Sequence, residues 1–551
     1  MTAWISRVGD VARKTIDTLG RATREQTSSV TGSTSSLGRE MSNGDLSRDR
    51  FVNPIAEGAD PSVVRDGDRF LWCQAEGNVG VSIWVSDRLT SMGTKHVVWT
   101  ADAEGPCSKE VWAPELHMID GRWHIYFAAS DGENRNHRTY ALVSDTDDPI
   151  GSYSLHGPLF TGDEPGGDNL WAIDFTVLQH HGRLFGLWSG WPDLDTDLQH
   201  LYAAEMSSPT EIKTGRVRLL EAGTFDWQRV DETPRTRGLI EGPRVFQPAD
   251  GQVFVTYTCA ASWLPTYKVG LLGLTGDDPL DPEAWHAYDR PVFESSPETF
   301  GAGHGSFVDL EGQWWYVFHS KVYPTDGWQR TLHVQPVDVA SSGAPVMGAP
   351  RARGADLPVP TGQPWTPRSD AATWDFRQVG VDDFDYYGHH QFFAVSDAGL
   401  DLGCVPAEPV NDFRSAEKFV LRDGDYENVK IELTVDLLDA QRSVGVLFRT
   451  TAPSIGFDTQ RGYYACFSLD THDLVLGRTD GEEWTTLATE KLQVRRDRTQ
   501  TMTITAEGDH LRVTCSGAAV DTHDDHYRRG SVGMRVVECH ARYLTLSVTP
   551  L

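Results

Sequence analysis

Basic residues are scarce in this chain of 551 residues. It has 49 lysines and arginines against 79 aspartates and glutamates, which gives a formal net charge of −30 at pH 7. Nucleic acids and anionic membranes are bound mainly through lysine and arginine. The charge balance therefore predicts no nucleic-acid partner and no membrane partner, and it is compatible with a neutral ligand.

Cysteine is also rare, and long apolar runs are missing. The seven cysteines are odd in number, scattered, and without a CxxC pair, which indicates free thiols in a reducing compartment and not a disulfide framework or a zinc site. No run of 18 apolar residues predicts a transmembrane helix. The N-terminus lacks the apolar core of a secretory signal, so we expect a cytoplasmic protein. The cysteines are Cys73, Cys107, Cys259, Cys404, Cys466, Cys515 and Cys539.

Residues 1–50 are expected to form a partly disordered leader. The first 22 residues have helical spacing, and a Ser/Thr/Gly-rich stretch follows them. Two interpretations stay open for the helical part: an amphipathic helix that touches a membrane or a partner, or a frayed leader.

One sequence pattern recurs from Phe51 onward. The stretches 66–76, 120–130, 181–191, 250–260 and 311–321 each begin with an acidic residue or histidine, followed by glycine, two spacers and an apolar run. Such a residue pair is typical of a hairpin turn, where glycine adopts positive φ. The turn glycines, at intervals of 54, 61, 69 and 61 residues, are Gly67, Gly121, Gly182, Gly251 and Gly312. Five all-β units predict a five-bladed β-propeller, with five hairpins of one large sandwich as the alternative.

The strand before each turn carries one polar residue within an apolar run. These residues lie six to ten positions before the turn glycine, and they are Asp60, Glu115, Asp174, Glu241 and His304. A buried carboxylate costs free energy unless it is paired or hydrogen-bonded. We expect the five to occupy equivalent positions on the innermost strands and to form a ring around the propeller axis.

Clustered carboxylates favour acid–base chemistry. Like charges at short range separate the pKa values of the carboxyl groups, so one can hold a proton while another stays ionised. Hydrolysis of a glycosidic bond needs this division, although an oxygen-rich cluster also suits calcium. Aromatic residues on the same strands are candidates for a sugar pocket or for the core; they are Trp72, Trp84, Trp112, Trp171, Trp188 and Trp191.

Several of these motifs resemble glycoside hydrolase family 43, in particular its exo-acting α-L-arabinofuranosidases. The motifs run in order from about Asn53 to Pro360: "NPIAEGADPSVVRDGDRFLW", "VWAPELHMIDGRWHIYFAAS", "WAIDFTVLQHHGRLFGLWSGW", "IEGPRVF", "GAGHGSFV" and "GWQRTLHVQPV". The resemblance implies a five-bladed propeller and an inverting mechanism that needs no cofactor for its chemistry.

The resemblance also implies roles for individual residues. Asp60 matches the general base, Glu241 the general acid, and Asp174 a third carboxylate that orients the acid and tunes its pKa. His304 matches a histidine beside a bound ion, so a structural calcium ion in the propeller channel is expected; a core histidine is the alternative. The residues expected to contact the sugar are Trp112, Asn78, Ser189, Phe175, His304 and Arg330.

Departures from the family pattern put the sugar specificity in question. Phe175 stands where a small residue is expected, so its bulk is predicted to decide which sugar fits. Ala302 and Gly305 stand where proline and asparagine are common. Arg244 follows the predicted acid by three residues and is expected to point out of the strand; a side chain that faces the pocket is the alternative.

The C-terminal part predicts a second all-β domain. Residues 51–355 are expected to form the propeller, 356–371 a linker and 372–551 a β-sandwich of short alternating strands. The strand order is similar to concanavalin-like sandwiches, including carbohydrate-binding module family 66. Sugar binding and a structural cap on the propeller stay open as its role.

These patterns lead to one functional hypothesis with alternatives. We expect an inverting exo-glycoside hydrolase that releases terminal α-L-arabinofuranose from arabino-oligosaccharides or glycan side chains during polysaccharide degradation. A β-xylosidase or another pentosidase of the same fold is the alternative within the class. A non-catalytic sugar-binding propeller is the alternative outside it.

Overall fold

Strands make up nearly all of the regular structure. The computed structural model describes residues 50–551 except 231–234, 250, 390–391, 404–415 and 495. Within these residues the helical elements are short 3₁₀ turns: η1 (Asn134–Asn136), η2 (Asp226–Gln228) and η3 (Pro282–Ala284). The predicted leader lies outside the described residues apart from Arg50.

The first three sheets of the N-terminal domain follow one another along the chain. Blade 1 contains β3 (Ser62–Asp66), β4 (Arg69–Glu76), β5 (Gly80–Ser86) and β6 (Thr94–Thr100). Blade 2 contains β7 (Lys109–Ile119), β8 (Arg122–Ser130), β9 (Arg138–Ser144) and β10 (Tyr153–His156). Blade 3 contains β11 (Ala172–His180), β12 (Arg183–Gly190), β13 (His200–Ser208), β14 (Glu211–Ile212) and β15 (Val217–Leu220).

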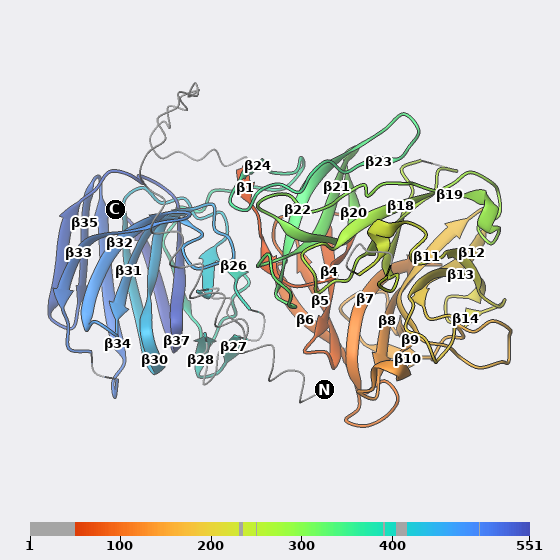
Figure 1. Ribbon diagram of the computed structural model, residues 1–551. Coiled ribbons are helices and arrows are strands. Elements are labelled where there is room, and N and C mark those ends of the chain that lie inside the picture. The colour runs from red at the N-terminus through yellow and green to blue at the C-terminus, as the bar shows by residue number, and fades with distance from the viewer. Residues whose placement is uncertain (1–49, 231–234, 250, 390–391, 404–415, 495) are drawn as a thin grey trace, which may run out of the picture. The chain divides into compact units, whose positions relative to one another are not determined.

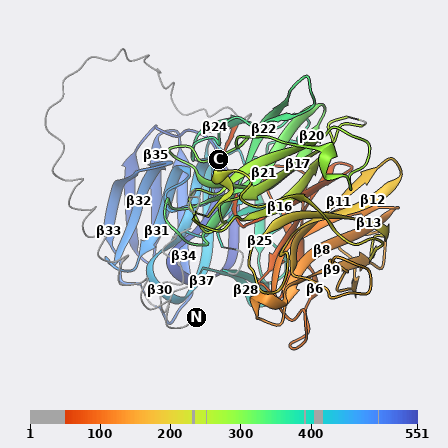
Figure 2. The ribbon, with the colours of Figure 1, turned by 45° about the vertical axis from the view of Figure 1, so that its right-hand side comes forward.

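Two further sheets complete the ring. Blade 4 contains β16 (Ile240–Phe246), β17 (Phe254–Cys259), β18 (Lys268–Leu274) and β19 (Trp285–Ala287). Blade 5 contains β20 (Phe300–Leu310), β21 (Gln313–Lys321) and β22 (Arg330–Val339), with β23 (Pro345–Val346) and, from the start of the chain, β2 (Ala56–Glu57). The inner strands β3, β7, β11, β16 and β20 contact one another in this order, and β20 contacts β3. The colour accordingly passes from red to green around the ring (Figure 1 and Figure 2). The predicted five-bladed β-propeller is confirmed.

An apolar cluster fills each space between neighbouring blades. Leu71 and Ile125 belong to the cluster between blades 1 and 2, and Leu187 and Val255 to the one between blades 3 and 4. Corresponding clusters lie between blades 2 and 3, 4 and 5, and 5 and 1. Trp72, Trp84 and Trp188 belong to these clusters, so they are core residues. Burial of these apolar faces holds the blades side by side.

The predicted turn glycines adopt left-handed backbone conformations. Their φ values lie between 61° and 86°, and each glycine precedes the second strand of its blade. A side chain is rarely stable in this region. The repeat pattern therefore located the hairpin of every blade.

Phe175 is a core residue and does not face the propeller axis. Its side chain is fully buried, stacks on Trp188 with ring centroids 5.8 Å apart and lies 5.0 Å from Tyr126. Gly186 leaves the space that the Phe175 ring occupies, because a Cβ there would lie 2.1 Å from Cζ of Phe175. The prediction that Phe175 contacts the sugar is therefore wrong, and its bulk fills the space between blades 2 and 3.

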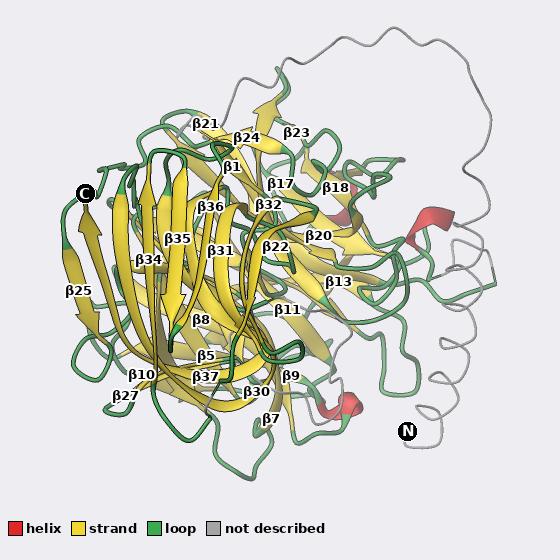
Figure 3. Cartoon of the chain, turned by 90° about the vertical axis from the view of Figure 1, so that its left-hand side faces the viewer, coloured by secondary structure: helices red, strands yellow, loops and turns green. Residues whose placement is uncertain are grey.

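The C-terminal domain is one strongly curved, nearly closed sheet with an apolar interior, as expected of a β-sandwich. Its two longest strands, β30 and β37, pair along most of their lengths (Figure 3). The strands are β25 (Ala372–Asp375), β26 (Phe384–Tyr387), β27 (Phe393–Ser396), β28 (Gly399–Leu402), β29 (Lys418–Leu421), β30 (Val429–Thr451), β31 (Arg461–Ser468), β32 (Asp473–Asp480), β33 (Trp484–Lys491), β34 (Gln500–Glu507), β35 (His510–Cys515), β36 (Ala518–His523) and β37 (Ser531–Pro550).

One strand of this domain is longer than the short strands that the sequence predicts. Residues 429–437 and 442–450 each alternate like a separate strand, but both belong to β30. The pairing of β30 with β37 shifts register between Leu437 and Asp439 and again between Ala440 and Ser443. Bulges carry the strand through a polar stretch that resembles a turn.

Part of the predicted linker is a strand. The segment β24 (Asp356–Pro358) pairs with β1 (Arg50–Val52), which precedes the closing strand β2. The first residues of the predicted linker are therefore hydrogen-bonded to the N-terminal domain.

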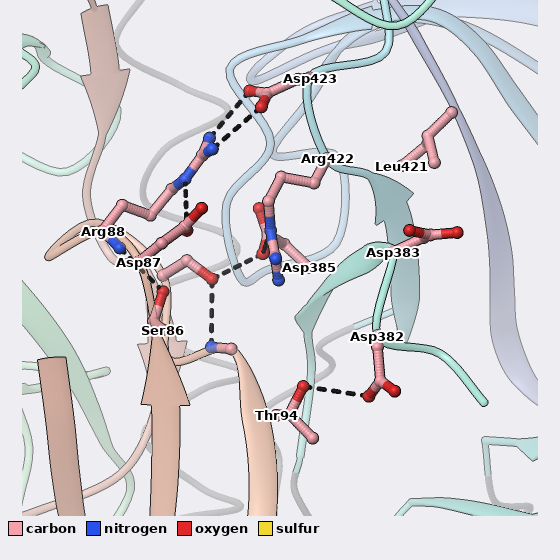
Figure 4. Close-up of polar contacts among 12 residues, drawn as sticks. Ser86, Asp87, Arg88, Thr94, Asp382, Asp383, Asp385, Leu421, Arg422 and Asp423 are labelled. Atoms are coloured by element: carbon pink, nitrogen blue, oxygen red, sulfur yellow. Dashed lines mark hydrogen bonds and ion pairs between the residues drawn. The ribbon is translucent and has the colours of Figure 1, made fainter. Parts of the chain in front are cut away.

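Polar contacts join blade 1 to the sandwich (Figure 4). Arg88 donates two hydrogen bonds to the carboxylate of Asp423, at 2.9 and 3.0 Å, and both side chains are largely buried. Ser91 donates to Asp385 at 2.6 Å, and Arg422 donates to the same oxygen at 3.0 Å. A buried arginine–carboxylate pair with two parallel hydrogen bonds fixes the relative orientation of the two side chains.

The cysteines among the described residues are free thiols, and Cys404 lies outside those residues. None of the described helices is long and apolar enough to cross a membrane.

The packing of Phe175 against Gly186 leads to a test of the core. Gly186→Ala is expected to lower the free energy of unfolding by about 1–3 kcal/mol, because overpacking forces the ring or the backbone to move. Phe175→Leu in the same chain should recover part of this loss. Denaturant unfolding of both single variants and the double variant gives the coupling energy. Additive effects of the two substitutions would contradict the contact.

Candidate active site

The inner strand of every blade has a left-handed residue near its start. In blades 2 to 5 the ladder with the second strand breaks at a β-bulge and resumes at Glu115, Thr176, Arg244 and Ser306. The residue two positions earlier has positive φ in each case, as does Asp60 two positions before the first paired residue, Ser62. The φ values are 49° for Asp60, 43° for Ala113, 55° for Asp174, 56° for Gly242 and 41° for His304. Bulges and left-handed non-glycine residues cluster at functional sites.

This alignment corrects the predicted ring of equivalent residues. Asp60, Asp174 and His304 occupy the left-handed position, but Glu241 precedes it by one residue and Glu115 follows it by two. A bulge breaks the strict alternation of side chains along a strand. Glu241 therefore reaches the same region as Asp174 from a position that is not equivalent to it.

Asp60 is held by three strands of blade 5. Its Oδ1 lies 3.1 Å from His304 Nδ1, 3.1 Å from His319 Nδ1 and 3.1 Å from Arg330 Nη1. Burial alone would raise the pKa of Asp60, but the charges of Arg330 and His304 hold it well below its usual range. Asp60 is therefore a stable carboxylate.

The pKa values of the two histidines beside Asp60 shift in opposite directions. Burial lowers the pKa of His304, but Asp60 and Asp174 raise it further, and the net shift is upward. Burial lowers the pKa of His319 to about 4, so His319 is neutral at neutral pH. One of its contacts is the backbone N–H of Asp60, which donates to His319 Nδ1 at 3.1 Å.

Asp174 is a buried carboxyl group beside Glu241. Its Oδ2 accepts a hydrogen bond from the backbone N–H of Gly242 at 2.9 Å. Burial, together with the charges of Glu241 and Asp60, outweighs the charge of His304 and raises the pKa of Asp174 to about 7. Asp174 thus keeps its proton to much higher pH than Asp60 does.

Glu241 is positioned by a glutamine and by the backbone around it. Gln199 Nε2 donates to Glu241 Oε2 at 3.2 Å, and Thr258 Oγ1 donates to the Glu241 carbonyl at 2.9 Å. Ser189 Oγ donates to the carbonyl of Ile240 at 2.7 Å. Ser189 is fully buried, so it supports the strand of Glu241 and is not the predicted sugar contact.

Glu115 and Arg244 form a second cluster on the same inner strands. Arg244 Nη1 lies 2.5 Å from Glu115 Oε1, and both side chains are buried. Thr176 Oγ1 donates to the same oxygen at 2.5 Å, and His117 Nε2 lies 3.0 Å from it. Burial raises the pKa of Glu115, but Arg244 and His117 lower it more, so the pair is ionic. The prediction that Arg244 points out of its strand is wrong.

The other predicted sugar contacts lie in two places. Trp112 stacks on His137 with ring centroids 3.8 Å apart, and it packs beside the stacked pair Trp171 and Trp191. Asn78 is exposed in the turn between β4 and β5, and its carbonyl accepts the N–H of Val111. Neither residue has a described contact with the three carboxylates, whereas Arg330 and His304 contact Asp60 directly.

An exposed aromatic residue lies beside Arg330. Trp328 is 60% exposed; its ring lies 5.7 Å from the Arg330 guanidinium and 5.6 Å from Trp263. Lys321 Nζ donates to the carbonyls of Trp263 and Gly327 and so joins the two loops.

The sequence interpretation missed His319 and Gln199. His319 stands in the apolar run "WYVFHSK", and a polar residue within an apolar strand is the same signal that identified Asp174. Gln199 carries no comparable signal because it lies at a strand edge in a polar stretch.

The described side chains around His304 do not by themselves form a calcium site. Calcium takes six to eight oxygen ligands, and the described residues contain no group of three or more His, Cys, Asp or Glu side chains that could hold a metal. His304 Nδ1 faces Asp60, and the charge of Arg244 lowers the pKa of His304. A positive guanidinium thus lies within electrostatic range of the predicted metal ligand.

The comparisons with known proteins point to one family. A sequence model described as "Glycosyl hydrolases family 43" matches residues 51–345. An "Extracellular exo-alpha-(1->5)-L-arabinofuranosidase" of Streptomyces avermitilis is 30% identical over 345 residues, covering 59% of this chain and 69% of that protein. A protein of the same name from Streptomyces chartreusis is 28% identical over 271 residues, covering 47% and 79%.

A solved structure agrees with these matches. The crystal structure of alpha-L-arabinofuranosidase from Lactobacillus brevis is similar with a TM-score of 0.50 and 28% sequence identity. The match covers 55% of this chain and 98% of that one.

The raised pKa of Asp174 leads to a prediction about stability. Between its usual pKa of 3.8 and its folded pKa of about 7, the folded protein binds more protons than the unfolded protein, so this residue makes the free energy of unfolding fall as the pH rises. Asp174→Asn removes the effect. The free energy of unfolding of the variant minus that of the wild type should rise from about pH 4 to about pH 7 and then level off.

Denaturant unfolding across this pH range measures the difference. Asp68→Asn, at an exposed position in the turn after β3, is the matched control and should show a difference that does not change with pH. A pH-independent difference for Asp174→Asn would contradict the raised pKa.

Proposed function

The chain belongs to glycosyl hydrolase family 43, and from this membership we propose that it is an inverting, exo-acting α-L-arabinofuranosidase. Its substrate is a glycan, and the proposed bond is that of a terminal α-L-arabinofuranose. The observation that carries the proposal is the electrostatic cluster of Asp60, Asp174 and Glu241, which come from blades 1, 3 and 4. The names of the two Streptomyces relatives support the sugar.

Asp60 suits the role of general base. A base that activates water must be ionised at working pH, and Arg330 and His304 keep Asp60 in that state. His304 and Arg330 contact its carboxylate and His319 accepts its backbone N–H, and together they fix its direction. In an inverting reaction this group takes a proton from the water that attacks the anomeric carbon.

Glu241 suits the role of general acid. The leaving oxygen needs a proton as the glycosidic bond breaks, and Asp174 keeps a proton up to about pH 7 beside Glu241. The Gly242 N–H holds Asp174, and Gln199 holds Glu241. A carboxyl group that stays protonated near neutral pH, close to a second carboxyl group, is a common arrangement for acid catalysis.

The exposed Trp328 suits stacking on the glycan near the proposed base. Its ring is free to stack on a sugar, and it lies beside Arg330, which contacts the proposed base. Trp112, which is partly exposed beside the buried pair Trp171 and Trp191, is the second proposed aromatic contact.

The location and the role of the sandwich are separate proposals. The cytoplasm stays a proposal that rests on the free thiols, and the two Streptomyces relatives carry names that describe extracellular enzymes. Sugar binding by the sandwich likewise stays a proposal.

Glu241→Gln is expected to lose more activity on a substrate whose leaving group needs protonation than on one whose leaving group does not. The loss in kcat/KM on an arabino-oligosaccharide should be about 10²–10⁴-fold, and it should be smaller on 4-nitrophenyl α-L-arabinofuranoside. Glu283→Gln, at an exposed position in η3, is the control and should retain wild-type rates. Full activity of Glu241→Gln, or no wild-type activity on any pentoside, would overturn the proposal; activity on the β-D-xyloside alone would replace it with a β-xylosidase.

The stereochemical course is expected to be inversion. Proton NMR during early hydrolysis of the α-L-arabinofuranoside should show β-L-arabinofuranose as the first product, followed by mutarotation. A first-formed α product would assign a retaining mechanism and remove Asp60 from the role of base.

A further inference from the structure

We propose that Arg244 is a positioning residue on the propeller axis. Its guanidinium is a built-in cation that holds the inner strands under the catalytic carboxylates, in place of the calcium ion that the family resemblance predicts. The catalytic consequence of this inference rests on the proposed function. The structural part concerns only the contacts of Arg244 with the inner strands.

The ion pair joins blades that are not neighbours. Glu115 belongs to β7 in blade 2 and Arg244 to β16 in blade 4, with blade 3 between them in the ring. The two side chains can meet only by crossing the space where the inner strands face one another. The pair therefore spans the propeller axis.

The pair is part of a belt of residues at one equivalent position. These are the residues at which the inner ladder begins or resumes after the left-handed position: Ser62, Glu115, Thr176, Arg244 and Ser306. Each lies two residues beyond the position of Asp60, Asp174 and His304. We name these five residues the inner belt.

The inner belt connects all five blades. Ser306 of blade 5 donates to the Pro61 carbonyl and accepts the Val63 N–H of blade 1. Ser62 of blade 1 accepts the Leu116 N–H of blade 2. Glu115 then contacts Thr176 of blade 3 and Arg244 of blade 4. Arg244 supplies the contact to blade 4, which carries Glu241 three residues earlier on the same strand.

The belt carries both a negative and a positive side chain of its own. Its carboxylate, Glu115, already contacts Arg244, Thr176 and His117 through one oxygen. Arg244 lies within electrostatic range of His304, the predicted calcium ligand. A guanidinium is a permanent cation with a fixed donor geometry, so it provides positive charge at the axis without an exchangeable ion.

The first experiment asks whether the wild type uses calcium at all. Protein dialysed against EGTA and protein with added calcium chloride should have the same thermal unfolding midpoint, and dialysed protein should contain no stoichiometric calcium. The rate of arabinofuranoside hydrolysis should also be equal in both. Stoichiometric calcium together with a raised midpoint would overturn the proposal. The unfolding and metal-content measurements need no substrate, so they decide this point even if the proposed activity fails.

The second experiment removes the cation. Arg244→Met is expected to lower kcat by about tenfold or more with a smaller change in KM, since misplacing a catalytic group by about 1 Å can cost about 10²-fold. Arg244→Lys should retain most of kcat, and guanidinium ions at low concentration should partly restore Arg244→Met, whereas sodium at equal ionic strength should not. Arg449→Met, which removes a buried arginine of the sandwich, is the matched control and should leave kcat unchanged.

The pattern of results separates the positioning role of Arg244 from the proposed catalytic function. If Arg244→Met does not fold, Glu115→Gln/Arg244→Met removes both buried charges and is expected to fold with the same loss of kcat. A folded Arg244→Met with wild-type kcat would overturn the positioning role while leaving the requirement for Glu241 untouched. Loss of activity in Arg244→Met that calcium chloride restores and guanidinium does not would equally overturn it.

Discussion

The position of Asp60 depends on how the ring closes. The short strand β2 from the start of the chain pairs with β22, with Ala56 opposite Leu332, and Asp60 follows three residues after its end. The side chains that hold Asp60 come from β20, β21 and β22 of that same blade. Closing the propeller and fixing the proposed base are therefore one structural event, because a propeller that failed to close would leave Asp60 without its partners.

The electrostatic differences among the carboxylates follow from their partners. Asp60 has Arg330, and Glu115 has Arg244, so each of these carboxylates stays ionised in spite of its burial. Among the described residues no ion pair reaches Asp174, which has a backbone N–H instead, and its pKa rises to about 7. Buried ion pairs contribute little net stability but fix geometry. In this site they also determine which carboxyl group keeps a proton.

The sequence was sufficient for the architecture and for the residues that meet at the axis. The turn glycines located every hairpin, and the polar residue in each apolar strand located Asp60, Asp174, Glu241 and His304. Their exact register was not predictable, because the bulge that shifts Glu241 by one position leaves no mark in residue type. The corresponding bulge in β11 explains the error at Phe175, whose side chain turns into the core, where Gly186 leaves room for it. The partner of Arg244 was out of reach for a different reason: Glu115 lies two blades away, and local spacing carries no information about a contact across the axis.

The sandwich contacts the segment on which ring closure depends. Ser454 donates to the Pro54 carbonyl at 2.6 Å, and Pro54 lies between β1 and β2. Arg461 pairs with Asp356 on β24, the strand that holds β1. Since β2 closes the propeller and leads directly to Asp60, a domain that contacts Pro54 and the partner of β1 restricts the motion of the closing segment. The structural-cap interpretation of the sandwich therefore has a physical basis in these contacts. It leaves the rest of the sandwich surface available for a glycan, so the two interpretations that the sequence left open are compatible with each other.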